Sequence, residues 1–155
     1  MKSKFMREAI RLSVRQMRAG NGGPFGAVVV CKGKVVGRGF NLVTSTNDPT
    51  AHAEVVAIRE ACRKLKTFKL EDCEIYTSCE PCPMCLSAIY WARIKRVYFA
   101  NTRKDAAKIG FDDDVLYREL AMPMSKRSMP MKQFMREAAR SAFAEWQTKE
   151  DKVQY

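Results

Sequence analysis

Apolar residues recur along the chain with helical spacing in some stretches and strand spacing in others, and turn residues separate the stretches. The first stretch, about residues 4–19, has apolar residues three or four apart and predicts a helix with one buried face. That face is expected to consist of Met6, Ile10, Val14 and Met17. The glycine-rich segment 20–24 ends the helix.

Two strands are predicted after this helix. Residues 25–31 form an apolar run rich in valine, and a second strand over about 34–40 follows the turn Lys32-Gly33-Lys34, so the two predict a hairpin. A polar loop then leads to a second helix over about 52–65. Its buried face is expected to consist of Val55, Ile58, Cys62 and Leu65.

A strand, a helix and another strand come next. The strands are predicted over 73–78 and 95–100, and the helix between them begins in the cysteine-rich segment 79–85 and runs to about Ala92. This order is typical of a crossover between parallel strands, whose ligands bind beyond the carboxyl ends of the strands. The pattern therefore indicates an α/β fold with a site near segment 79–85.

The last part of the chain is less regular. A short helical stretch follows Asn101, a connector with Met and Pro spans 121–130, and a final helix is predicted over about 131–149. We treat 1–155 as one domain, because this length suits a single core. On sequence alone, residues 152–155 are expected to form a frayed end.

The composition bears on where in the cell the protein is expected and on the state of its cysteines. No apolar run approaches eighteen residues and the N-terminus is charged, so we expect neither a membrane span nor export, and a cytoplasmic location. Three of the six cysteines lie within seven residues, and the others, Cys31, Cys62 and Cys73, lie within apolar patterns. This is unlike a spaced disulfide framework, so we expect reduced thiols.

The net charge of +11 is the global feature that raises the question of an anionic partner. Arginines line one side of the first helix, and basic residues recur every four positions near the C-terminus. Such faces suit phosphates, but they are more often solvated surface. Because basic charge favours every polyanion, it identifies no substrate, and we do not expect a nucleic acid partner.

The candidate chemistry lies in two short segments. Cys82 and Cys85, three apart at the start of a helix, bring two sulfurs close together, and the single histidine, His52, stands two residues before Glu54. One imidazole and two thiolates leave an open position on a zinc ion, as catalytic sites require. His-x-Glu followed by Pro-Cys-x-x-Cys is the signature of zinc deaminases, in which the glutamate moves protons and does not bind metal.

Two other interpretations of these cysteines remain open. A Cys-x-x-Cys pair in a reduced protein can be a redox pair, or it can be half of a closed structural zinc site in which Cys79 is the fourth ligand. His52 and Glu54 can meet at one metal only at the N-terminal end of a helix, because residues two apart point away from each other along a regular helix. The positive end of the helix dipole then favours thiolates.

With these residues in place, the chain resembles the cytidine deaminase superfamily and, within it, the bacterial-type guanine deaminases. The zinc signature alone indicates the superfamily. The guanine deaminases are indicated by Ser78-Cys79-Glu80-Pro81-Cys82-Pro83-Met84-Cys85 together with Gly110-Phe111-Asp112-Asp113. The resemblance implies a three-layer α/β/α sandwich with a mixed five-stranded sheet, and zinc-dependent hydrolysis of guanine to xanthine and ammonia.

The resemblance also assigns the substrate contacts. It implies that Phe25 stacks on the purine, that Asn41 bonds its edge, and that a carboxylate among residues 112–114, with Asp113 favoured, accepts ring N–H groups. Without it, Phe25 would be interpreted as core, Asn41 as a turn residue and the aspartates as a helix cap. It further implies a homodimer that exchanges segment 131–155, so that Tyr155 closes the partner's site.

Rival functions differ in what they require. A tRNA adenosine deaminase shares the zinc motifs and would explain the basic charge, but it usually lacks Pro83 and the Gly-Phe-Asp-Asp-Asp segment. Guanosine or amino-triazine deamination would need much the same ring contacts. A structural zinc module that binds nucleic acid would need a fourth ligand such as Cys79 and would have no use for Glu54.

Overall fold

The computed structural model describes residues 2–111 and 113–155, and the chain divides into two compact units, Met1–Asp114 and Val115–Tyr155. The elements of the first unit are α1 (Lys2–Arg18), β1 (Gly26–Cys31), β2 (Lys34–Phe40), α2 (Val43–Thr46), α3 (Ala53–Leu65), β3 (Cys73–Cys79), α4 (Pro83–Trp91), β4 (Arg96–Asn101) and α5 (Arg103–Lys108). Helix α6 (Asp114–Ala121) begins at the boundary, and η1 (Met124–Lys126) and α7 (Arg136–Thr148) belong to the second unit.

The sheet of the first unit is mixed. Its strand order is β2-β1-β3-β4, in which β1 pairs antiparallel with β2 and β3, and β3 pairs parallel with β4. The expectation of five strands was wrong: the described residues form a sheet of four. The apolar pattern itself predicted four, and the segment after β4 becomes helix because Thr102 and Asp105 form a capping box that begins α5.

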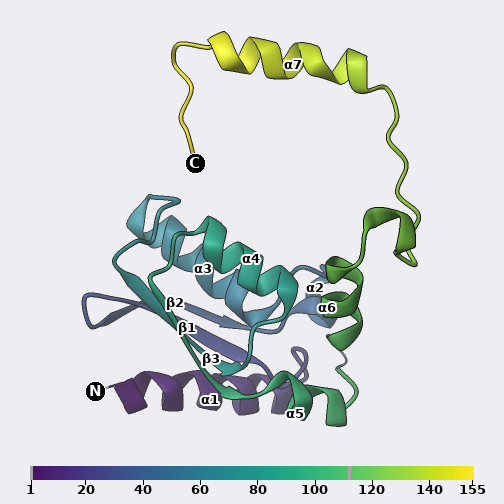
Figure 1. Ribbon diagram of the computed structural model, residues 1–155. Coiled ribbons are helices and arrows are strands. Elements are labelled where there is room, and N and C mark those ends of the chain that lie inside the picture. Colours follow the sequence, from purple (N-terminus) through teal and green to yellow (C-terminus); the bar gives the residue numbers. More distant parts are fainter. Residues whose placement is uncertain (1, 112) are drawn as a thin grey trace. The chain divides into compact units, whose positions relative to one another are not determined.

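Alternation along the strands creates two cores, one on each face of the sheet. Val28, Val30 and Tyr76 pack against α1, whereas Ala27, Val29 and Ile75 belong to the core with α3 and α4. Figure 1 shows α1 on one side of the sheet and α3 and α4 on the other. The layers of the first unit are therefore those of an α/β/α sandwich, as predicted.

The buried face of the first helix was predicted mostly wrongly: of the expected residues, only Met6 packs against the core, and it is half-buried. The residues of α1 that are buried are Phe5, Ala9, Leu12 and Ser13, while Ile10, Val14 and Met17 are exposed. The reason is a close approach to β1: a Cβ added to Gly26 would lie 2.4 Å from the Ala9 carbonyl oxygen. The helix is therefore turned so that Ala9 and Ser13 lie at the point of contact with Gly26, with Phe5 and Leu12 buried beside them. The other apolar residues of α1 face outward.

The second buried face was predicted only in part. Of the expected residues in α3, Ile58 is buried, Val55 and Cys62 are half-buried, and Leu65 is exposed. The helix instead buries Ala53, Glu54, Ala57, Ile58 and Ala61. Gly37 and Gly39 of β2 lie against these alanines, so the packing is again one of small residues.

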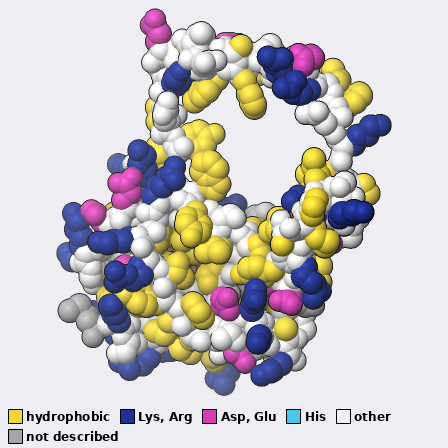
Figure 2. Space-filling model, in the orientation of Figure 1, with side chains coloured by type: hydrophobic (Ala, Val, Ile, Leu, Met, Phe, Trp, Pro, Cys, Tyr) yellow, Lys and Arg dark blue, Asp and Glu magenta, His cyan; other side chains and the backbone are white. Residues whose placement is uncertain are grey.

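The second unit contains one longer helix. Helix α7 begins at Arg136, later than the predicted start at 131, because Pro130 and not a capping residue precedes position 131 and Met135 adopts a left-handed backbone (φ 52°). Figure 2 shows hydrophobic side chains on the surface of this helix. Among the described residues, no helix combines the length and the apolar character needed to cross a membrane.

Candidate metal centre and active site

The two segments that carry the candidate chemistry lie at helix starts. His52 is the N-cap residue of α3 and Cys82 is the N-cap residue of α4, and both have an extended backbone. Pro83 occupies the start of α4, where its missing N–H costs nothing because that amide has no partner within the helix. The positive ends of both helix dipoles therefore lie at this site, where they favour thiolates.

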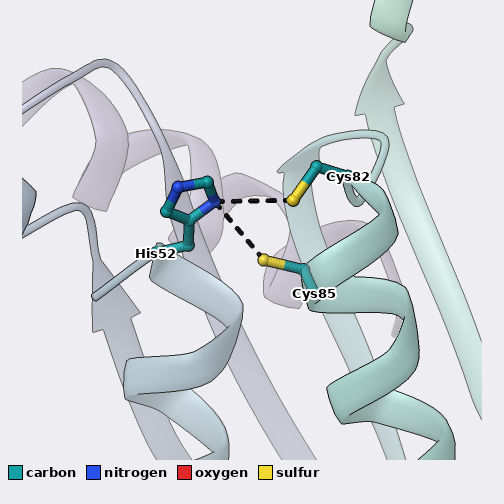
Figure 3. Close-up of side chains that lie close together, drawn as sticks. All are labelled: His52, Cys82 and Cys85. Atoms are coloured by element: carbon teal, nitrogen blue, oxygen red, sulfur yellow. Dashed lines mark hydrogen bonds between the residues drawn. The ribbon is translucent and has the colours of Figure 1, made fainter. Parts of the chain in front are cut away.

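Three donor atoms come together between these helix starts. His52 Nδ1 lies 3.6 Å from Cys82 Sγ and 3.5 Å from Cys85 Sγ, as Figure 3 shows. All three atoms lie within 4.8 Å of one another. Tetrahedral zinc, with bonds of about 2.3 Å to sulfur and about 2.1 Å to nitrogen, requires nitrogen-to-sulfur separations of about 3.6 Å. The donor set therefore fits zinc in kind, number and spacing.

The electrostatics of the three side chains are tightly linked. Hydrogen bonds from Cys85 and His52 outweigh burial and lower the pKa of Cys82 to about 4. The same contact with Cys82 raises the pKa of Cys85, and burial raises it further. The bond to Cys82 also raises the pKa of His52, and the nearby charges of Glu54 and Asp113 add to this effect. The contacts within the group thus favour a thiolate at Cys82.

Glu54 lies in the first turn of α3, next to this metal-binding group but not part of it. It is 6% exposed, and burial raises the pKa of its carboxyl group above the ordinary value of 4.5. Its Oε1 lies 3.2 Å from the hydroxyl oxygen of Thr77 on β3. A raised pKa makes a carboxyl group a better proton acceptor than an ordinary glutamate.

Cys79 does not join the metal-binding group. Among the described residues, the only group of three or more potential ligands is His52, Cys82 and Cys85. The Cys79 thiol instead donates to the carbonyl oxygen of Thr102 at 3.6 Å, and burial raises the pKa of Cys79 to about 11. The described residues therefore offer a group of three candidate ligands and not the four of a closed cage.

A cavity of about 220 Å³ opens beside these residues. Its lining includes three of the residues expected to contact substrate, namely Phe25, Asn41 and Asp113, and it also includes Glu54. Asp112 lies outside the described residues, and Tyr155 belongs to the second unit. Of the described candidates in the first unit, His52, Glu54, Cys82 and the three expected substrate contacts line this cavity, whereas Cys85 and Asp114 do not.

Phe111 is a cavity residue that the sequence analysis did not single out. Its ring meets that of Phe25 edge to face, with centroids 4.8 Å apart and an interplanar angle of 90°. Its position two residues before Asp113 was the available signal. Edge-to-face packing fixes the plane of the Phe25 ring, which prepares an aromatic face for a flat ligand.

The orientation of the Asn41 amide follows from its partners. Its Oδ1 accepts from the backbone N–H groups of Val43, at 3.2 Å, and Gly23, at 3.4 Å. With the oxygen held in this way, the amide nitrogen is the group that remains for a ligand. Asn41 therefore offers a hydrogen-bond donor to the cavity.

Comparison with known proteins agrees with this geometry. The family model for the cytidine and deoxycytidylate deaminase zinc-binding region matches residues 1–101. A guanine deaminase from Bacillus subtilis is 49% identical over 151 residues, which cover 97% of each chain. A tRNA-specific adenosine deaminase from Aquifex aeolicus is 43% identical over 103 residues, which cover 66% of this chain and 68% of the relative.

The fold gives the same result. The solved structure of guanine deaminase from Bacillus subtilis superposes with a TM-score of 0.96 at 48% sequence identity, covering 99% of this chain and 98% of the other. This match extends through both compact units, whereas the zinc-binding family model ends at residue 101.

Proposed function

The chain belongs to the cytidine and deoxycytidylate deaminase family, and on that premise we propose that it is a guanine deaminase that uses zinc to hydrolyse guanine to xanthine and ammonia. One observation carries the choice of guanine. The similarity to the Bacillus guanine deaminase extends over 97% of the chain, whereas the similarity to the tRNA-specific enzyme covers 66%. Phe111 and Asp113, which line the cavity, lie beyond residues 1–101, the region that the zinc-binding family model matches.

Proton transfer is the role we assign to Glu54. His52, Cys82 and Cys85 would hold the zinc ion, which would lower the pKa of a water molecule to near neutral pH. Glu54 borders the same cavity and is not part of the metal-binding group, so its carboxylate is available to take the proton of the water. It then delivers this proton to the ring nitrogen beside the reacting carbon and assists the departing amine. Positioned general acid–base catalysis of this kind is worth about 10²–10⁴-fold.

Recognition of the purine follows from three side chains. The ring of Phe25, held by Phe111, stacks on the flat heterocycle, and the donor of Asn41 bonds an acceptor on its edge. Asp113 accepts from the N–H groups of the ring and amine, which adenine and cytosine do not present in the same arrangement. A polar pocket of this kind rejects analogues that leave its groups without partners.

The size of the cavity suits a single base. About 220 Å³ is below the roughly 300–1,000 Å³ of sites for drug-sized ligands, so it suits one ring system without a sugar. Ammonia release from guanine, guanosine, cytidine, ammeline and an anticodon stem-loop tests this choice directly. Guanine should be turned over fastest. Preferential release from the stem-loop would make the protein a tRNA deaminase, and release from none would remove the enzymatic proposal.

We further propose that the protein is a homodimer in which residues 131–155 are exchanged between subunits. Helix α7 presents apolar side chains to solvent, including Phe143 at 80% and Trp146 at 44% exposure, and no described residue of 115–155 is buried. An amphipathic helix in this state needs another surface to cover it. In the exchanged dimer, Tyr155 closes the partner's cavity over the purine and excludes water.

Complementation tests the exchange. A chain carrying Glu54→Ala and a chain lacking Tyr155 should each be nearly inactive, because each lacks one group of the composite site. A mixed dimer contains one site with both groups, so co-expression should restore activity. If mixed dimers form, as shown by differently tagged chains, and remain inactive, then the tail serves its own chain and the exchange is wrong.

The compartment we propose is the cytoplasm. All six cysteines are free thiols, and Cys82 and Cys85 must remain reduced to bind metal. Oxidation of this pair would remove two of the three proposed ligands, so a reducing environment is a condition of activity.

A further inference from the structure

Thr77 lies directly behind the glutamate that we assign to proton transfer. It follows Ile75 by two residues on β3 and so lies on the face of the sheet that packs against α3. Its side chain is 1% exposed. The hydroxyl oxygen lies 3.2 Å from Glu54 Oε1 and 2.9 Å from the carbonyl oxygen of Cys79.

The two partners make different demands on one hydroxyl group. A threonine hydroxyl has one proton to donate and two lone pairs that accept, whereas a carbonyl oxygen only accepts. When the hydroxyl donates to Cys79, as the shorter distance favours, it presents a lone pair toward Glu54. When it turns to Glu54, it presents its proton. The contact is therefore satisfied whether the carboxyl group carries a proton or not.

Glu54 needs such a contact because the terminal torsion of a glutamate is broad. A carboxyl group without a fixed partner turns readily about its last bond, and its reacting oxygen then moves away from the substrate. Besides its contact with the Cys85 thiol, the carboxyl group has a bond to Thr77 that holds Oε1 on the side of β3, while Glu54 lines the cavity. Small misplacements of a catalytic group are expensive in rate.

We infer that Thr77 is a positioning residue for the proton transfers of Glu54. The inference rests on the proposed deaminase function. During turnover, Glu54 takes a proton from water and passes it to the purine, while the proton of Thr77 stays on its own oxygen and turns between Cys79 and Glu54. Thr77 therefore orients the carboxyl group without contacting substrate or metal.

Three variants separate this role from a structural one. Thr77→Val replaces the hydroxyl by a methyl group at nearly constant volume, and Thr77→Ser keeps the hydroxyl. Ser78→Ala is the matched control, because Ser78 is also a buried hydroxyl of β3 but accepts from the backbone N–H of Gly26, 3.0 Å away, and does not line the cavity. Zinc content and thermal unfolding of each variant are measured beside its kinetics.

Thr77→Val should lower kcat by about 10–100-fold. The KM for guanine should stay within about threefold, because the lost interaction orients a catalytic group and does not bind substrate. The affinity for hypoxanthine, which has the purine ring without the 2-amino group, should also be unchanged in calorimetry. Thr77→Ser should recover most of the lost kcat. Ser78→Ala should have the kcat of the wild type.

Other outcomes overturn the inference. If Thr77→Val retains the kcat of the wild type, or if Thr77→Ser is no better than Thr77→Val, the hydroxyl does not position Glu54. Should Thr77→Val fail to fold, Thr77→Cys, with its weak donor, takes its place under the same criteria. A wild-type protein that does not deaminate guanine refutes the proposed function and the inference with it, whereas an active wild type with an equally active Thr77→Val refutes the inference alone.

Discussion

Gly39→Ala adds one methyl group, which should displace the start of α3 and disrupt the metal site. A Cβ at this residue would lie 1.9 Å from the carbonyl oxygen of Ala53 and 2.5 Å from the amide nitrogen of Ala57. Ordinary contact begins at 3.4 Å, so the start of α3 would have to retreat by about 1.5 Å, the difference between the shorter distance and that limit. Backbone atoms cannot avoid this clash by changing rotamer.

The retreat is large on the scale of a metal site. His52 immediately precedes Ala53, and its Nδ1 fits zinc only while it stays near 3.5 Å from Cys85 Sγ. Metal sites tolerate deviations of about 0.2 Å in their ligand distances. Gly39→Ala should therefore lose most of its zinc and nearly all of its activity. Overpacking against backbone should also lower the free energy of unfolding by about 3 kcal/mol or more.

The measurements are zinc per chain by plasma mass spectrometry, urea unfolding and ammonia release. The control is Gly33→Asn, because an added Cβ there meets no atom within 4 Å and asparagine tolerates the φ of 75°. This variant should keep its zinc. If Gly39→Ala binds zinc stoichiometrically and turns over at the wild-type rate, then the close approach of β2 to α3 does not set the geometry of the site.

Three further variants test single contacts. Cys79→Ser should keep its zinc, because the thiol bonds Thr102 and lies outside the metal-binding group; zinc loss would reinstate a closed site. Asp113→Asn should lower kcat/KM for guanine by orders of magnitude without unfolding the protein, and unaltered kinetics would move the role to another residue. The bond to Thr102 holds the pKa of Asp105 below its ordinary value of 3.8, so this carboxylate stabilises the fold above that pH and ceases to do so as the pH falls through its folded-state pKa. Asp105→Asn should therefore remove the loss of stability that protonation of this carboxylate causes at acid pH. An acid-unfolding curve identical to that of the wild type would contradict this role of Asp105.

The sequence predicted element types well because each element obeys a local rule. Each of the four strands has alternating or continuous apolar residues between turn residues. The starts of α3 and α4 coincide with the zinc signature. The convergence of His52 with Cys82 was also predictable, since both positions lie at helix starts on the same side of the sheet. These features depend on spacing along the chain and need no knowledge of packing distances.

Packing distances explain most of the errors. Hydrophobicity favoured Ile10, Val14 and Met17 as the buried face of α1, but the sheet accepts Ala9 and Ser13 because the helix lies close to Gly26. The spacing of apolar residues along a helix does not depend on the size of their side chains, so it cannot predict which of them fit against the sheet. Glycines in a strand that faces a helix were the available signal, since they permit a close approach with small residues such as Ala9 at the point of contact.

Contacts between distant segments were the other limit. Thr77 looks like an ordinary strand residue in sequence, and only the folded chain shows it against Glu54. The edge-to-face contact between Phe25 and Phe111 joins residues far apart along the chain. Neither the separation nor the residue types predict such pairs, because the hydrogen-bonding and ring geometry that defines them arises only on folding.

The helix starts at the site lack the caps that helices usually have, and this has a consequence for metal removal. His52 and Cys82 make no side-chain capping bond, whereas Thr102 and Asp105 cap α5 reciprocally. A missing cap costs about 1 kcal/mol per helix, far less than the roughly 10–16 kcal/mol that structural zinc contributes. Bound zinc would therefore anchor both helix starts in place of caps. Chelation should speed amide hydrogen exchange in the first turns of α3 and α4 and leave that of α5 unchanged. Equal acceleration in all three helices would mean that zinc stabilises the unit as a whole, and no change in α3 and α4 would mean that packing alone holds their starts.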